Sequence, residues 1–137
     1  MRLTLPLEVW IPRKTTEDKR FTMNLNIYRN AHHMTLNQAK MQMKAHVGLA
    51  LDGNHAGPDE AAPYRFTYTI FPPTGRAFDL GNVGSIVQKF TDDALVELGV
   101  IKDDNHKIIS EVVYRFGGVD KENPRAELLI ESRLQDD

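Results

Sequence analysis

The sequence predicts an α/β (α+β) fold in which two main helices pack on a mixed β-sheet. Three patterns lead to this prediction: an N-terminal segment with an apolar residue at every second position, two segments with apolar residues every three or four positions, and short runs rich in aromatic and β-branched residues. Strands and helices in such an order are typical of a sheet that carries helices. A chain of 137 residues without cysteine is expected to form one domain, residues 1–137, without disulfides.

The N-terminal part contains the first predicted strand and a less regular segment. Residues 3–11 place an apolar side chain at every second position, and Pro6 suggests that this strand lies at the edge of a sheet. Residues 12–20 are polar and are expected to form a loop. Residues 21–34 mix strand-forming residues with three asparagines, which favours an irregular strand.

The first predicted helix and the next strand follow. Residues 35–51 have an apolar stripe of helical period, and Thr35 and Gln38 have the spacing of a capping box at the start of this helix. Residues 52–63 contain Gly, Pro and Asn and are expected to form an exposed loop. Residues 64–71 are rich in aromatic and β-branched residues and are predicted to form a strand.

The C-terminal half contains the second main helix and two more strands. The apolar stripe of this helix runs from Val83 to Leu98, and Gly99 is expected to end it. Residues 107–116 and 125–134 are predicted to be strands.

Charge is distributed unevenly along the chain. Residues 1–49 hold eight Lys/Arg and three Asp/Glu, whereas residues 50–137 hold nine Lys/Arg and sixteen Asp/Glu. A basic part beside an acidic part suits a protein that contacts phosphates around a carboxylate metal centre, although the two parts can also pair with each other. The predicted DNA-contacting residues are Arg13, Lys14, Lys19, Arg20, Arg29, Lys40 and Lys44.

Hydropathy predicts a location away from membranes. No apolar run approaches the roughly 18 residues that span a bilayer, and the first residues lack the pattern of a signal peptide. We therefore expect a cytoplasmic protein with no membrane partner.

Acidic residues at both ends of the second predicted helix are candidates for binding a hard divalent cation. Asp79 precedes the helix, and Asp103 and Asp104 follow it. A helix of about 16 residues is about 24 Å long, so these acids can share an ion within one chain only if the helix is shorter or broken. Gly81 and Gly84 weaken the start of the helix, and a site shared between subunits is another arrangement. The alternatives without a metal are a helix cap at Asp79 and a turn at Asp103 and Asp104.

Residues 88–104, QKFTDDALVELGVIKDD, together with DLGN at residues 79–82, resemble the central motif of the RusA-type Holliday-junction resolvases. The motif of this family contains Asp-x-Asp-Asn, a lysine, Asp-Ala-Leu and a downstream Asp-Asp pair. The resemblance is strongest over residues 76–130, and YRFGGVDKENPR is also similar to uncharacterised phage proteins of this group. Gly81 stands where the family has its second upstream aspartate, and about four extra residues, near one helical turn, precede Lys89.

This resemblance implies a Mg²⁺-dependent endonuclease, with Mn²⁺ as an alternative ion, that acts as a homodimer. It would resolve Holliday junctions or other branched DNA during phage recombination or DNA processing. The implied catalytic residues are Asp79, Lys89, Asp103 and Asp104, of which Asp79 and Asp104 would ligate the metal. Asn82 would orient the loop, Lys89 would neutralise charge at the phosphate, and Asp93 would orient Lys89.

The glycine at position 81 leaves a second interpretation open. A RusA-like protein that has lost cleavage would act by binding branched DNA or a host protein. Asp92 and Glu111 are the acids closest in sequence that could replace the missing carboxylate. Trp10 is expected to pack in the fold or at a dimer surface, and the adjacent His32 and His33 lack metal-ligand spacing.

Overall fold

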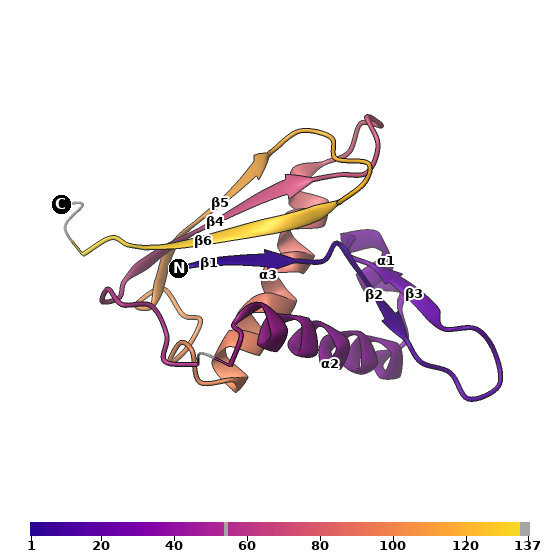
Figure 1. Cartoon of the computed structure of the whole chain (residues 1–137), viewed down its shortest axis with the longest axis horizontal. Coiled ribbons are helices and arrows are strands. Elements are labelled where there is room, and N and C mark those ends of the chain that lie inside the picture. The colour runs from indigo at the N-terminus through magenta and orange to yellow at the C-terminus, as the bar shows by residue number, and fades with distance from the viewer. Residues whose placement is uncertain (54, 135–137) are drawn as a thin grey trace.

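A four-stranded mixed sheet and a separate two-stranded sheet form the β part of the computed structural model, which describes residues 1–53 and 55–134. The larger sheet has the order β1-β6-β4-β5, with β4 and β5 parallel and the other pairs antiparallel. Its strands are β1 (Arg2–Leu5), β4 (Tyr64–Phe71), β5 (Ile109–Phe116) and β6 (Arg125–Ser132). The long helices α2 (His33–Ala50) and α3 (Leu80–Glu97) pack with this sheet (Figure 1), so the predicted α+β fold class is confirmed.

The hydrophobic core lies between the sheet and the helices. On β4, Phe66, Tyr68 and Ile70 are buried, and α3 packs against both β4 and β5. The opposite sheet face carries ion pairs, such as Arg65 with Glu111 at 3.6 Å. Because one side of α3 is held against the sheet, its polar residues divide into a set that faces the sheet and a set that faces outwards.

The predicted strand at residues 3–11 is two strands in different sheets. β1 ends at Leu5 and pairs with β6 at the edge of the larger sheet, whereas β2 (Glu8–Ile11) pairs with β3 (Lys19–Thr22). Pro6 has no backbone N–H for a ladder, so the chain leaves the sheet there. The edge position expected from Pro6 is confirmed for β1, and the predicted loop at residues 12–20 ends earlier because β3 begins at Lys19.

The irregular strand predicted at residues 21–34 is wrong. After β3, the short helix α1 (Leu25–Asn30) begins, and α2 follows it almost directly. The Asn24 side chain caps α1, because its Oδ1 accepts hydrogen bonds from the backbone N–H groups of Asn26 and Ile27 at 2.8 and 3.3 Å. Asn24 therefore acts as a capping residue, a position that asparagine favours.

Both predicted long helices are present, but each begins at a different residue from the one predicted. α2 begins two residues early, because Nδ1 of His32 accepts a hydrogen bond from the N–H of Met34 at 3.2 Å; the cap is not Thr35. α3 begins at Leu80, so the expectation that Gly81 and Gly84 keep this part irregular is wrong. Gly99 follows the end of α3 with φ +78°, as predicted for a terminating glycine.

Gly84 allows α3 to lie directly on β5. A Cβ at this position would lie 2.6 Å from Cδ1 of Tyr114. We expect Gly84→Ala to lower the free energy of unfolding by about 1–3 kcal/mol, because overpacking outweighs the gain in helix propensity. Gly48→Ala on α2 is the matched control: its Cβ would meet nothing within 4 Å, so it should raise stability by about 0.5–1 kcal/mol. Urea unfolding distinguishes them, and stabilisation by both variants would contradict the packing explanation.

Candidate functional site

A stripe of α3 that faces away from the sheet carries several of the predicted site residues, of which Lys89 is exposed and Asn82 and Asp93 are half-buried. Asn82, Lys89 and Asp93 fall within an arc of about 40° at 3.6 residues per turn. Asp79 precedes the first turn of the same helix, and Lys89 is exposed at the middle of it. The Nζ of Lys89 lies 6.0 Å from the ring centroid of Tyr28 on α1. The structure therefore gathers Asn82, Lys89 and Asp93 on one face, with Asp79 at its start.

Asp79 is the N-cap of α3. Its Oδ1 accepts a hydrogen bond from the backbone N–H of Gly81 at 2.8 Å, and its carbonyl accepts one from Asn82 at 3.1 Å. A Cβ on Gly81 would lie 3.3 Å from the same Oδ1. Asp79 is therefore a helix cap, as the alternative without a metal predicted, and it remains exposed at the surface.

Asp103 and Asp104 lie beyond the other end of α3, in a turn. Oδ1 of Asp103 accepts a hydrogen bond from the backbone N–H of Asp104 at 2.7 Å, and its Oδ2 accepts one from the Asn105 amide at 2.9 Å. The 18 residues of α3 form an uninterrupted helix about 27 Å long. Asp79 and Asp104 of one chain are therefore too far apart to ligate the same ion.

The lysines of α2 are paired with the acids of α3. Lys40 Nζ lies 3.5 Å from Asp93 and 3.3 Å from Glu97, and Lys44 Nζ lies 3.3 Å from Glu97. Hydrogen bonds from both lysines hold the pKa of Glu97 below its usual value. Asp93 thus pairs with Lys40, and its predicted orientation of Lys89 stays a prediction. Lys40 and Lys44 thus have acidic partners within the fold, and their contact with DNA stays a prediction.

A buried polar network lies on the sheet side of α3, and none of its hydrogen bonds was predicted from the sequence. Asp92, which is 4% exposed, accepts hydrogen bonds from Tyr68 Oη at 3.1 Å and Gln88 Nε2 at 3.2 Å. Tyr114 donates to Oε1 of Gln88. The one feature of the sequence that points to this network is the four-residue spacing of Gln88 and Asp92, which places both side chains on one side of a helix.

Burial raises the pKa of Asp92 to about 7. The hydrogen bonds from Gln88 and Tyr68 oppose this rise, whereas the negative charges of Asp104 and Asp93 add to it. The charge of Asp104 therefore acts on Asp92. A carboxyl group that is only partly ionised at neutral pH is poorly suited to holding a cation.

Neither acid considered as a replacement for the carboxylate missing at Gly81 lies beside Asp79. Asp92 is about 20 Å from Asp79 along the helix axis and points toward the sheet. Glu111 lies on the open sheet face, where it pairs with Arg65 at 3.6 Å and with Arg133 at 3.7 Å. Within one chain, therefore, neither acid stands in for the carboxylate missing at Gly81, and their part in a site shared between two chains stays a prediction. Within residues 1–53 and 55–134, no three His, Asp or Glu side chains lie close enough to hold one metal ion.

The β2–β3 hairpin carries most of the remaining predicted DNA contacts. Arg13 and Lys14 lie in its exposed loop, and Lys19 and Arg20 lie on β3. This hairpin extends away from the larger sheet (Figure 1). Trp10 is 51% exposed, so it does not pack inside the fold, and the alternative that it lies at a dimer surface stays a prediction. Arg29, in the last turn of α1, is also exposed.

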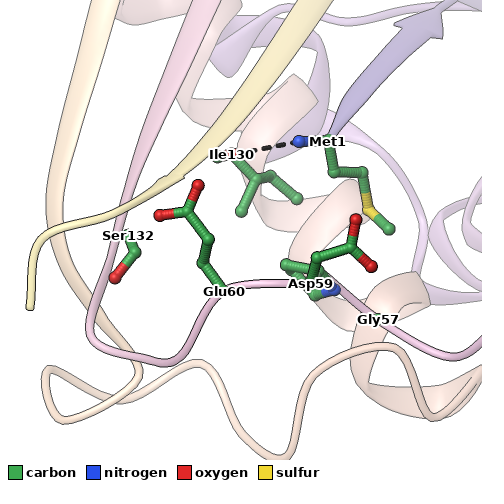
Figure 2. A pocket seen from close by; sticks show the side chains of 7 residues that line it. Met1, Gly57, Asp59, Glu60, Ile130 and Ser132 are labelled. Carbon is green, nitrogen blue, oxygen red and sulfur yellow. Dashed lines mark hydrogen bonds between the residues drawn. The ribbon is translucent and has the colours of Figure 1, made fainter.

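Two hollows in the surface differ in chemistry. One, of about 280 Å³, is lined by Asp59, Glu60 and Ser132, and the amino group of Met1 donates a hydrogen bond there to the carbonyl of Ile130 at 3.2 Å (Figure 2). It contains none of the predicted site residues. The other, of about 450 Å³, is mainly apolar and lies between the hairpin and the residues around the start of α3.

Comparison with known proteins leaves the family open. No protein-family model and no curated protein matches this sequence. None of the helices in the described part of the chain has the length and apolar character required to cross a bilayer.

Proposed function

We propose that the protein is a RusA-like, Mg²⁺-dependent endonuclease that works as a cytoplasmic homodimer on Holliday junctions and other branched DNA. The observation that carries this proposal is the outward stripe of α3. Along it, Asn82, Lys89 and Asp93 follow Asp79 in the order of the motif that the sequence resembles. The exposed side chain of Lys89, with acidic residues before and after it on the same helix, suits contact with a phosphodiester.

The hairpin supports DNA binding independently of α3. Four cationic side chains lie in its loop and on β3: Arg13, Lys14, Lys19 and Arg20. Glu8 lies 3.7 Å from Arg20, and this pair is exposed to solvent. Cations on a projecting hairpin suit the DNA backbone, because phosphate contacts give affinity without dependence on base sequence. Selection of a branched substrate by its shape fits contacts of this kind.

The proposed chemistry requires residues from two chains. Hydrolysis adds water to the phosphorus atom, breaks one P–O bond and transfers a proton to the leaving oxygen. Lys89 would offset the charge that develops on the phosphate. Asp79 of one subunit and Asp104 of the other would hold the Mg²⁺, with Asp103 beside it, because one chain keeps these acids at opposite ends of α3. When bound, Mg²⁺ supplies a site at which the pKa of water is lowered.

A junction-cleavage assay tests this function. Purified protein is incubated with a synthetic four-way junction or a linear duplex, in Mg²⁺, Mn²⁺ or EDTA. We expect cleavage of the junction that EDTA abolishes and that Lys89→Ala slows by roughly 100-fold, since a charge contact at the phosphate is removed. Lys40→Ala is the matched control and should change the rate less than about twofold, because Lys40 is already paired with Asp93 and Glu97. Cleavage in EDTA, or equal effects of both substitutions, would contradict the proposal.

Gly81 favours a second candidate function. Because glycine supplies no carboxylate and Asp79 already caps α3, the chain also suits a RusA-like protein that binds branched DNA or a host protein without cutting. In the same assay, junction binding without cleavage in any metal would support the DNA-binding form. Failure to bind DNA, together with specific capture of a host protein, would support the other.

A further inference from the structure

An apolar pocket of about 450 Å³ lies between the β2–β3 hairpin and the start of α3. Glu8, Arg20 and Thr22 line it from the hairpin, while Phe78 and Val83 line it from the segment that begins α3. Phe78 directly precedes Asp79, so this pocket adjoins the exposed acid of the proposed nuclease site. Of the residues that line this pocket, only Arg20 is among the site residues predicted from the sequence.

The walls of this pocket combine an aromatic surface with an adjacent cation. Phe78 is 37% exposed and packs at 6.3 Å, between ring centroids, against Phe116. The Arg20 side chain is 62% exposed, and its Nε lies 3.7 Å from Glu8. An apolar slot with an aromatic ring and a guanidinium suits a flat aromatic ligand that is attached to an anion.

Trp10 extends the same surface. It lies directly opposite Arg20 in the hairpin register, and Glu8 is opposite Thr22. Since side chains alternate between the two faces of a strand, Trp10, Glu8, Arg20 and Thr22 share the exposed hairpin face. Val9, Ile11 and Phe21 on the other face are buried in the core. An exposed tryptophan beside arginine is a common stacking surface for nucleobases.

We propose that this pocket receives one unpaired nucleobase of branched DNA, with the base against Phe78 and the adjoining phosphate near Arg20. This inference rests on the proposed function, because it requires that the protein binds DNA. An unpaired base is already unstacked at a branch point or bulge, so placing it in a pocket costs less than extracting one from a duplex. The pocket would then help the protein to select branched over continuous DNA.

The test compares three DNA probes with the full-length chain: a paired duplex, the same duplex with a one-base bulge, and the same bulge with an abasic nucleotide. Fluorescence anisotropy gives the dissociation constants in EDTA, which prevents cleavage. We expect the bulged duplex to bind about 10-fold more tightly than the other two. As the only tryptophan, Trp10 should also change its emission with the bulged probe.

Two substitutions examine the pocket itself. Phe78→Ala removes the stacking ring, and Val83→Phe fills the space; each should reduce the bulge preference to less than about twofold while the affinity for paired duplex is kept. Leu49→Ala, at an exposed position of α2, is the control and should retain the preference. Equal affinity of the wild type for all three probes, or an unchanged preference in Phe78→Ala, would overturn the inference and leave the proposed function standing. Failure to bind any of the three probes would also overturn the inference, whereas the four-way junction assay decides the proposed function separately.

Discussion

Homodimers of Asp79→Asn and of Asp104→Asn should each cleave junctions at least about 100-fold more slowly than the wild type. A heterodimer of the two variants should still cleave. In the proposed two-chain site, this heterodimer has one site with both substitutions and one site with neither. It should therefore nick junctions at about half the wild-type rate. Co-expression of two differently tagged chains and sequential affinity purification give the heterodimer, and a labelled four-way junction measures nicking.

The reciprocal heterodimer is the control for this prediction. It pairs a wild-type chain with a chain that carries both substitutions, so every site formed between chains lacks one carboxylate. We expect it to be inactive. If the site lay within one chain, the activities would be reversed: the reciprocal heterodimer would cleave and the first heterodimer would not. That result would contradict the separation of Asp79 and Asp104 along α3.

The free energy of unfolding should fall as the pH rises from about 4 to about 7, because of Asp92. Burial raises the pKa of this carboxyl group from 3.8 to about 7 in the folded protein. The folded state therefore holds a proton that the unfolded state has released across this interval. The stabilising effect is complete below the unfolded pKa and is lost as the pH rises through the folded pKa. Its full size is on the order of 4 kcal/mol.

Urea unfolding at several pH values between 4 and 8 measures this effect. Asp92→Asn keeps a neutral side chain of the same shape between Tyr68 and Gln88, so the fall in stability should largely disappear. Asp93→Asn is the neighbouring control; it removes a half-buried partner of Lys40 and should retain the fall. Wild-type and Asp92→Asn curves with the same slope would show that the buried carboxyl group does not titrate as described. The pKa values of Asp120 and Glu97 are lowered, so these two groups have the opposite effect on stability. Their stabilisation is present above the ordinary carboxyl pKa and is lost as the pH falls through the lowered values.

The local patterns of the sequence were sufficient to predict the α+β class and most elements of the larger sheet. β4 matched its predicted residues, and the buried residues Ala39, Met43 and Val47 follow the predicted stripe of α2. These features depend on the period of apolar residues, which each segment carries within itself. Segment 21–34 was mispredicted because asparagine avoids strands but also caps helices, and the choice depended on the neighbouring chain.

The separation of the candidate acids was only partly predictable. Helix length gave the distance between Asp79 and Asp104, but the sequence left open whether Gly81 and Gly84 would break α3. The Asp79 cap and packing of Gly84 against Tyr114 accompany a helix that is continuous from Leu80. The pairing of Lys40 with Asp93 likewise depended on how α2 crosses α3.

The residue types that a site can use follow from the amino-acid order: acids at both ends of α3, cations in the first 49 residues and no thiol. Tertiary structure alone decided which of them meet. Asp92 and Asp93 are adjacent in sequence, yet a rotation of about 100° between successive helical residues sends one into the buried Tyr68 and Gln88 network and the other toward Lys40. Residues far apart in sequence, Arg20 and Phe78, line one pocket because the hairpin folds back beside the start of α3. Such contacts depend on the packing of whole elements, which no local pattern of side chains specifies.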